Sequence, residues 1–204
     1  NLFRALLSME ERDNPFDDDD LYEAMSLCLS CKACQSECPA SVDMAKLKSE
    51  FLQHYWDANG APLSALAMGF IARINRVAQK TPRLSNALLN GPLLGQITKA
   101  ALGIDRKRRL PSLARTSFRT WFKRRQKPPD STTTRRPVVL FIDEFTDMYD
   151  PHIGQAAVSV LEALGFEILA PNHVDSGRPL LSKGFVRAAA NRANKNVSIL
   201  APFA

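Results

Sequence analysis

Four cysteines near the start of the chain are the residues whose type and spacing most clearly predict chemistry. They are the only cysteines among 204 residues, and they follow the pattern C-x2-C-x2-C-x3-C-P, as Cys28, Cys31, Cys34, Cys38 and Pro39. Three thiolates at C-x2-C-x2-C spacing can wrap one face of a 4Fe-4S cube, and the fourth cysteine of this motif commonly reaches a different cluster. The spacing therefore predicts that all four cysteines bind iron-sulfur clusters.

Zinc is the competing metal. A structural zinc site usually joins two C-x2-C pairs that lie a dozen or more residues apart, and this sequence has no second, distant pair. A disulfide framework is not expected either, because all four cysteines fall within eleven residues of a fairly long chain. The pattern favours iron-sulfur ligation in a reducing compartment.

The number of clusters stays open at the level of sequence. All four cysteines could close one cube. Alternatively, Cys28, Cys31 and Cys34 hold one cube with a fourth ligand from outside this sequence, and Cys38 serves a second cube. The second arrangement agrees with an excised segment, which is also suggested by the first residue, Asn1, and by the apolar run that ends the sequence at 197–204.

The cysteines lie between two predicted helices. The acidic run Asp17–Asp20 favours the start of a helix at Leu21, because negative charge stabilises a helix N-terminus. Ser41 is a candidate N-cap for a second helix, from 42 to about 57. Further helical patterns cover 62–80, 84–102 with a break at Gly91-Pro92, and the basic stretch 112–126.

The last third of the chain has a different pattern. Apolar runs at 138–143, 166–170 and 197–201 predict three strands, and helical patterns after Asp150 and at 180–194 lie between them. This order predicts a right-handed parallel βαβαβ unit. The expected fold class is therefore α+β, an all-helical ferredoxin-like domain followed by a partial α/β domain.

Composition divides the chain into three parts. The net charge of +6 is concentrated in residues 104–136, which hold twelve lysines and arginines against Asp105 and Asp130. The Pro-rich stretch 127–137 has no apolar period and is expected to be a domain boundary. The predicted parts are a helical 4Fe-4S ferredoxin-type domain (1–103), a basic helical linker (104–136) and the N-terminal part of an α/β domain (137–204).

The basic linker has several candidate roles. Its cations alternate with Trp121 and Phe122, a combination that suits phosphates or an anionic membrane surface. A solvated interdomain helix is favoured first, docking to an acidic partner or a membrane second, and nucleic acid least. No stretch approaches the roughly 18 apolar residues of a membrane span, and the first residues do not have the pattern of a secretory signal. The expected location is cytoplasmic, with peripheral contact to the inner membrane as a candidate.

The stretch 14–44, NPFDDDDLYEAMSLCLSCKACQSECPASVDM, resembles the iron-sulfur part of fused FAD-linked oxidases of D-2-hydroxy acids, the relatives of D-lactate, glycolate and D-2-hydroxyglutarate dehydrogenases. In that family an upstream flavin domain oxidises the substrate, a helical ferredoxin domain carries electrons, and a cysteine-rich α/β domain follows. The resemblance implies an oxidoreductase in which this segment alone is not catalytic. It also implies FAD in the parent protein, not bound by this segment.

The second half agrees with this resemblance but departs from it at one place. Residues 138–147 and 151–167 are similar to the opening of the cysteine-rich domain, whose relatives carry a Cys-Cys-Gly-x-Pro signature. Here Asp175 and Ser176 replace the two cysteines before Gly177. A cluster held by that signature is therefore not expected in this chain.

The combined hypothesis is an iron-sulfur segment that relays electrons from the flavin of an upstream domain or subunit to an acceptor: a quinone, a cytochrome or an electron-transfer flavoprotein. The alternative is a redox-silent interaction module with a structural cluster and a basic helix that docks to a partner or a membrane.

Other candidate residues are weaker. His54, His152 and His173 share no ligand spacing, and Lys32 is expected to be solvated rather than to tune a cluster. Glu144, Asp147 and Asp150 follow a predicted strand, where parallel sheets place ligands, but no glycine-rich phosphate loop accompanies them. Arg178 after Gly177 is a candidate anion contact, with a structural turn favoured.

Overall fold

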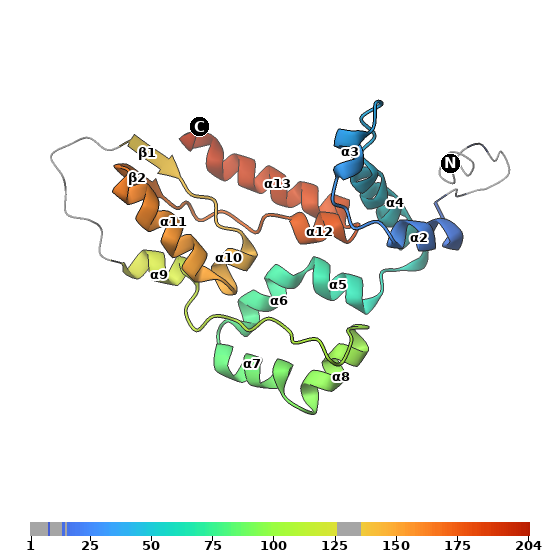
Figure 1. Ribbon diagram of the computed structural model, residues 1–204, viewed down its shortest axis with the longest axis horizontal. Helices are drawn as coiled ribbons and strands as arrows, with labels where there is room; N and C mark the ends of the chain where they lie inside the picture. Colours follow the sequence, from blue (N-terminus) through green and yellow to red (C-terminus); the bar gives the residue numbers. More distant parts are fainter. Residues whose placement is uncertain (1–7, 9–13, 15, 126–135) are drawn as a thin grey trace. The chain divides into compact units, whose positions relative to one another are not determined.

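The computed structural model describes residues 8, 14, 16–125 and 136–204, which form helices and one small parallel sheet (Figure 1). The elements are, in chain order, α2 (Asp19–Ser26), α3 (Ala33–Glu37), α4 (Met44–Asn59), α5 (Leu63–Gly69), α6 (Ile71–Ala78), α7 (Pro82–Asn90), α8 (Leu94–Ala101), α9 (Phe118–Arg124), β1 (Arg136–Val139), α10 (Glu144–Met148), α11 (Pro151–Ala163), β2 (Phe166–Leu169), α12 (Arg178–Ser182), α13 (Val186–Leu200) and the 3-10 turn η1 (Ala201–Phe203).

Contacts divide the chain into two compact units that interrupt each other in sequence. The first unit contains the chain up to Phe70 together with Gly177–Asn191, and the second contains Ile71–Ser176 together with Arg192–Ala204. The four cysteines belong to the first unit, and the parallel sheet belongs to the second. Each unit is described by itself below.

The core of the first unit lies between α2 and α4. Leu21 and Met25 lie one helical turn apart on α2, and they pack against Phe51, Leu52 and Tyr55 of α4. The predicted acidic helix start is confirmed, because the carboxylate of Asp18 accepts the backbone N–H of Leu21 at 2.8 Å. The packing of α2 against α4 therefore fixes both ends of the loop that connects them.

The segment Gly177–Asn191 completes the first unit. Helix α12 packs against α4 and α5, and the indole N–H of Trp56 donates to the backbone oxygen of Lys183 at 2.8 Å. Phe185 stacks at a tilt on Phe70, with ring centroids 5.1 Å apart. Residues far apart in sequence therefore support the cysteine-bearing helices.

The sheet of the second unit has two strands in the part of the chain that the structure describes. β1 pairs with β2 in parallel, with Val138 opposite Ile168, and α10 and α11 form the connection between them. The buried residues Phe118, Ile142, Val158 and Ile168 form its core. These elements are the α/β portion that the sequence predicts, so the α+β class is confirmed.

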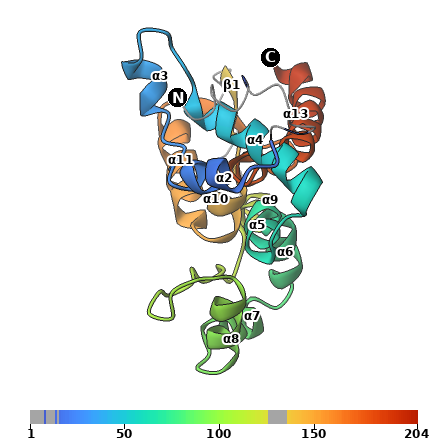
Figure 2. The same ribbon diagram turned by 90° about the vertical axis from the view of Figure 1, so that its right-hand side faces the viewer.

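Helices α7 and α8 form a hairpin in the second unit (Figure 2). The predicted break at Gly91-Pro92 is confirmed, since α7 ends at Asn90 and α8 begins at Leu94. The side chain of Asn86 both donates to and accepts from the backbone of Leu113, at 2.8 Å in each direction. This double hydrogen bond ties the following loop back onto α7.

The predicted third strand is wrong. Residues 197–200 belong to the long helix α13, and 201–203 form a 3-10 turn, so a βαβαβ unit is not present in the described residues. A short apolar run has the same composition in a strand and in a partly buried helix, and periodicity alone does not separate them. Here Asn196 fixes the helix, because its side chain binds the backbone of both Val174 and Asp175.

Smaller differences concern helix ends. Asp43, not Ser41, caps α4, because its carboxylate reaches the N–H of Lys46 at 3.0 Å while Ser41 has a left-handed φ of 51°. The pattern at 62–80 forms two helices that meet at Phe70, and the basic pattern at 112–126 forms helix only from Phe118 to Arg124.

Most of the predicted boundary at 127–137 lies outside the described residues. No described helix is long and apolar enough to span a bilayer.

Candidate metal centre

The cysteine loop leaves α2 and returns to α4 through two tight turns. Ser30 and Lys32 both have left-handed backbone conformations, with φ of 56° and 63°, and the short helix α3 begins directly after Lys32. Left-handed residues other than glycine are uncommon and bend the chain sharply. These two residues therefore mark sharp changes of chain direction between Cys28 and Cys34.

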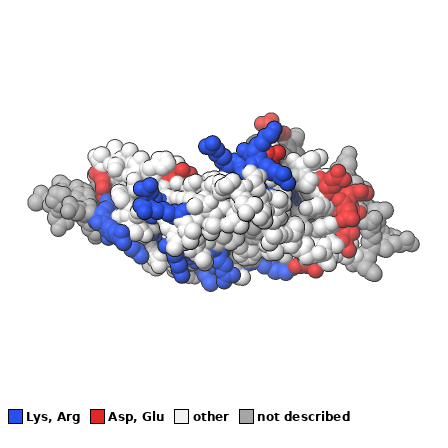
Figure 3. Space-filling view, turned by 90° about the horizontal axis from the view of Figure 1, so that it is seen from below, with Lys and Arg blue, Asp and Glu red and all other residues white. Residues whose placement is uncertain are grey.

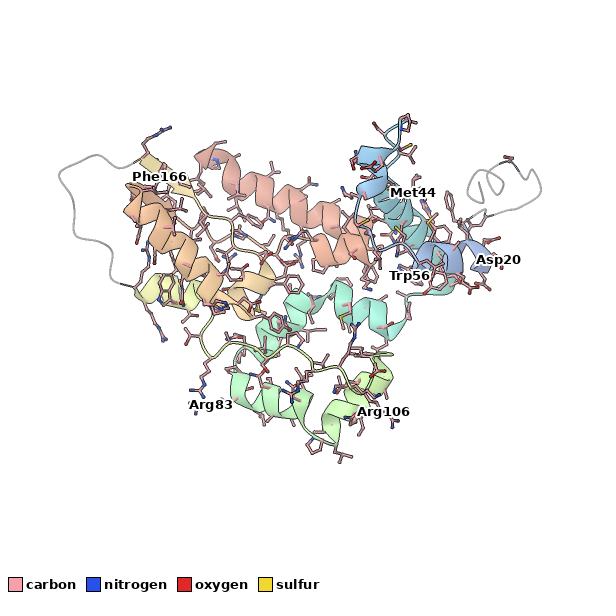
Figure 4. All side chains as sticks on the ribbon, viewed as in Figure 1. Asp20, Met44, Trp56, Arg83, Arg106 and Phe166 are labelled. Atoms are coloured by element: carbon pink, nitrogen blue, oxygen red, sulfur yellow. The ribbon has the colours of Figure 1, made fainter. Side chains whose placement is uncertain are left out.

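Three of the cysteines share one hollow. A cavity of about 460 Å³ is lined by Cys28, Cys31 and Cys34, together with apolar side chains of α2 and α4 that include Met25 and Met44. Figure 4 labels Met44 at the first turn of α4, beside this loop. Cys28 and Cys34 are half-buried and Cys31 is exposed. The hollow therefore combines sulfur ligands with an apolar floor.

Backbone N–H groups point at two of these sulfurs. The N–H of Ser30 lies 3.4 Å from the Sγ of Cys28, and the N–H of Met44 lies 3.4 Å from the Sγ of Cys34. Hydrogen bonds to ligand sulfurs stabilise thiolates and help to set the potential of iron-sulfur clusters. Two of the sulfurs in this cavity therefore already have a backbone N–H within hydrogen-bond distance.

Cys38 lies apart from the other three. It caps the end of α3 and is not among the residues that line the hollow. Its sulfur receives hydrogen bonds from the backbone of Val42, Ala40 and Ser41, which lower the pKa of the thiol below its usual value. These hydrogen bonds favour the thiolate form of Cys38, which is not among the residues that line the hollow shared by the other three cysteines.

The described residues contain no group of three or more His, Cys, Asp and Glu side chains that already converge as metal ligands. The four predicted ligands are therefore only partly brought together. The donor set nevertheless fits an iron-sulfur cluster, because Cys28, Cys31 and Cys34 line a single hollow with room for more than water.

Two lysines approach the loop in different ways. The ammonium of Lys48 on α4 donates to the backbone oxygen of Cys28 at 2.6 Å, and burial lowers the pKa of this lysine although Cys28 opposes the shift. Lys32 instead pairs with Asp43 at 3.3 Å. The cation directed at the loop is thus Lys48, which no local motif identifies because it lies twenty residues from Cys28.

A second cavity, of about 340 Å³, lies beside the carboxyl ends of β1 and β2 in the second unit. Glu144 and Asp147 line it, as their position after the strand suggests, whereas Asp150 is exposed. The buried His173, a weak candidate at the level of sequence, also lines it, and so does Arg119, which the sequence places in the basic linker. Arg119 pairs with Asp147 at 3.5 Å.

The two positions where the resembled family carries cysteines are occupied by a polar network. Glu144 accepts both the backbone N–H and the hydroxyl of Ser176, at 2.9 Å each. Asp175 pairs with Arg76 at 3.2 Å and with Arg192 at 3.1 Å. Oxygen atoms engaged in ion pairs and hydrogen bonds do not fit an iron-sulfur cluster, in agreement with the expectation that none is held here.

The remaining candidate residues, His54, His152 and Arg178, do not line the cysteine hollow. His54 is exposed and stacks on Phe16, with ring centroids 4.7 Å apart, and it does not line the cysteine hollow. His152 is exposed on α11. Arg178 is the first residue of α12, after Gly177 in a left-handed conformation.

Comparison with known proteins gives relatives along most of the chain. It is 27% identical over 191 residues to D-2-hydroxyglutarate dehydrogenase of Escherichia coli K12, which covers 89% of this chain and 18% of the relative. The same enzyme of Pseudomonas putida KT2440 is 26% identical over 192 residues, or 89% of this chain and 19% of the relative. One subunit of the anaerobic glycerol-3-phosphate dehydrogenase of Escherichia coli K12 is 31% identical over 103 residues, or 50% of this chain and 26% of the relative.

No family model matches the chain, and no solved structure matches it significantly. The chain spans about a fifth of the length of the dehydrogenases that it matches along most of its length. All three relatives carry the name of a dehydrogenase or of a dehydrogenase subunit. The chain is thus similar to a segment of larger oxidoreductases, which confirms the expected enzyme class.

Proposed function

We propose that this chain is an iron-sulfur electron-transfer segment of a flavin-linked dehydrogenase that oxidises a D-2-hydroxy acid. The observation that carries the proposal is the sharing of one apolar hollow by Cys28, Cys31 and Cys34, with backbone N–H groups at two of the sulfurs. Similarity to D-2-hydroxyglutarate dehydrogenases over 89% of the chain supports the substrate class. The glycerol-3-phosphate dehydrogenase relative is itself a subunit, which supports a role within a complex of several components.

A 4Fe-4S cluster, when bound, supplies a carrier that takes up and releases one electron at a time. The residues of this chain would do the rest. Cys28, Cys31 and Cys34 would hold it through their thiolates, and the apolar side chains of α2 and α4 would limit access of water. The cation of Lys48 would offset part of the negative charge at the site.

The position of Cys38 supports the two-cluster arrangement. Its sulfur lies outside the hollow and has its own set of backbone donors. We therefore infer that Cys38 serves a second cluster whose other ligands come from outside this sequence. The electron would then pass across the short α3 segment, which carries Cys34 and ends at Cys38.

Anaerobic reconstitution with iron and sulfide tests the proposal. The chain should become brown, should bind iron and acid-labile sulfide in equal amounts, and should show a reducible signal in electron paramagnetic resonance. Cys31→Ser should abolish this loading. Zinc bound in stoichiometric amount without sulfide would contradict an electron-transfer role.

Serine variants also decide the number of clusters. If Cys38 serves a second cluster, Cys38→Ser should leave most of the iron in place while Cys28→Ser and Cys34→Ser remove it. Equal losses in all four variants would show that one cube takes all four cysteines. In that case the electron-transfer proposal stands, but the two-cluster arrangement is dropped.

A further inference from the structure

The hairpin of α7 and α8 exposes several large aliphatic side chains. Leu93 is 70% exposed, Leu84 is 58% exposed and Ile97 is 57% exposed, and Leu88 and Leu94 are also on the surface. Leu84 and Leu88 lie one turn apart on α7, and Leu94 and Ile97 lie nearly one turn apart on α8. These five exposed residues of α7, of α8 and of the turn between them are called here the apolar ridge.

Cations accompany the apolar ridge. The stretch Arg106–Arg109 follows α8 and is exposed throughout, and it is called here the cationic loop. The ammonium of Lys99 donates to the backbone oxygen of Arg106 at 3.0 Å, and Asn86 holds Leu113 at the other end. These hydrogen bonds tie the segment 106–113, which includes the cationic loop, to α8 at one end and to α7 at the other.

The charge around the hairpin has one sign. Between Ile71 and Arg125 the sequence contains fourteen lysines and arginines and one acidic residue, Asp105. The carboxylate of Asp105 accepts the backbone N–H of Lys107 at 2.7 Å. Figure 3 views the molecule from below and shows a broad uncharged surface with lysines and arginines around it, and acidic residues are visible in the same view. Figure 4 labels two of these cations, Arg83 on α7 and Arg106 in the cationic loop, which point away from the hairpin.

We propose that the apolar ridge and the cationic loop form a docking surface for an anionic phospholipid bilayer. Aliphatic side chains with flanking lysines and arginines are the composition by which interfacial helices bind, with the apolar groups in the acyl boundary and the cations at the phosphates. An acidic protein would also pair with the cations, and binding to vesicles that contain no protein distinguishes the bilayer from it. A second copy of this chain would bring two cationic loops together, and their repulsion would oppose the contact.

Sedimentation with lipid vesicles tests this proposal on the full chain. Vesicles of equal parts phosphatidylcholine and phosphatidylglycerol should bind the chain at about 0.1 M salt, and about 1 M salt should weaken the binding because it screens charge. Vesicles of phosphatidylcholine alone should bind it at least about fivefold more weakly. Dependence on both salt and lipid charge distinguishes binding through the cations and the aliphatic residues from purely apolar adsorption, which depends on neither.

Matched variants locate the surface. Leu93→Asp should weaken vesicle binding about tenfold or more, because moving the leucine side chain from water into the bilayer is favourable and the aspartate loses this contribution. Leu164→Asp is the control, because Leu164 is 67% exposed but lies at the end of α11, outside the apolar ridge. Arg106→Glu should weaken binding at least about fivefold, whereas Lys195→Glu on α13 changes the net charge equally and should have little effect.

Three results would overturn the proposal. The first is no binding to anionic vesicles, and the second is equal loss of binding in the hairpin variants and their controls. The third is association of the chain with itself, in the absence of lipid, that Leu93→Asp abolishes, which would assign the surface to a second copy. Circular dichroism of each variant shows whether it folds. If Leu93→Asp does not fold, Arg106→Glu still tests whether the surface binds anionic vesicles.

Discussion

At the scale of single residues, charge near the cysteine loop is assigned by contacts rather than by sequence distance. Lys32 lies inside the motif but is paired with Asp43, whereas Lys48 lies on α4 and donates to the backbone of Cys28 at 2.6 Å. A cation beside a redox centre stabilises its reduced, more negative form. Lys48 is therefore the residue expected to raise the reduction potential.

The first prediction concerns this lysine. Lys48→Met should lower the reduction potential of the reconstituted chain, by on the order of tens of millivolts, because it removes a positive charge from the site. Lys46→Met is the control, since Lys46 is exposed on the same helix. The measurement is a redox titration followed by electron paramagnetic resonance. An equal shift in both variants would assign the effect to net charge rather than to the contact with Cys28.

His173 provides the second prediction. Its Nδ1–H donates to the oxygen of Val174 at 2.7 Å and its Nε2 accepts the N–H of Ile142 at 3.1 Å, so the neutral ring is fully engaged. Burial lowers the pKa of His173, with Arg119 lowering it further and Asp147 and Glu144 opposing. His173 therefore binds a proton less readily in the folded state than in the unfolded state. The contribution of the neutral ring to the free energy of unfolding should be lost as the pH falls below about 6.5, the ordinary pKa of histidine.

Thermal melting of the wild type and of His173→Gln checks this sign. The variant should melt at a lower temperature at neutral pH, and the gap between the two proteins should narrow as the pH is lowered toward 5. Protonation of carboxylates lowers the melting temperature of both proteins in acid, so only the difference between the two melting temperatures reports on His173. A gap that stays constant with pH would show that His173 does not titrate in this range.

At the scale of elements, local signals predict some helix starts and breaks and miss others. The acidic start at Asp18, the helix after Asp150, the break at Gly91-Pro92 and the change to β-branched runs after Pro137 are visible in the sequence and occur in the structure. The starts predicted at Ser41 and at 112 do not occur, because Asp43 caps α4 and α9 begins only at Phe118. The run at 197–201 fails as a strand because Asn196 is bound by the backbone of Val174 and Asp175. Such contacts depend on tertiary structure, so no local pattern could reveal them.

Gly184 gives the third prediction, for the turn between α12 and α13. Its φ of 79° is left-handed, and a Cβ at this position would lie 2.3 Å from the Cβ of Leu52 on α4. Gly184→Ala should therefore combine backbone strain with overpacking and destabilise the first unit by about 2–4 kcal/mol.

The matched control for this substitution is Gly165→Ala, at a φ of 85° with nothing within 4 Å of the added Cβ. It carries only the backbone cost, about 1–2 kcal/mol. Urea unfolding of both variants should separate the two contributions. Equal destabilisation would mean that α4 shifts away from the turn at no cost.

At the scale of the whole molecule, the sequence predicts the cysteine chemistry but not the residues that complete its unit. The motif, its spacing and the helices on either side follow from local patterns. The support from Gly177–Asn191 does not, because it depends on contacts such as Trp56 to Lys183 and Phe70 to Phe185 across more than a hundred residues. The second half of the chain therefore contributes to a site that lies in the first.

The last prediction follows from this interrupted arrangement. A chain that ends at Ser176 lacks the whole segment that packs on α4 and α5, so its cysteine-bearing unit should melt at a lower temperature and retain less iron after reconstitution. A chain that ends at Asn191 keeps this segment and loses only residues of the second unit, including Asn196. Its iron content should match that of the full chain.

The two tryptophans make the comparison specific. In a Trp121→Phe background, Trp56 is the only tryptophan, and it reports on the first unit through its hydrogen bond to Lys183. Its fluorescence should change at a lower temperature in the chain that ends at Ser176 than in the chain that ends at Asn191. Identical melting and identical iron content in both shortened chains would show that the cysteine-bearing helices fold without the distant segment, and the division into two interrupted units would then have no energetic meaning.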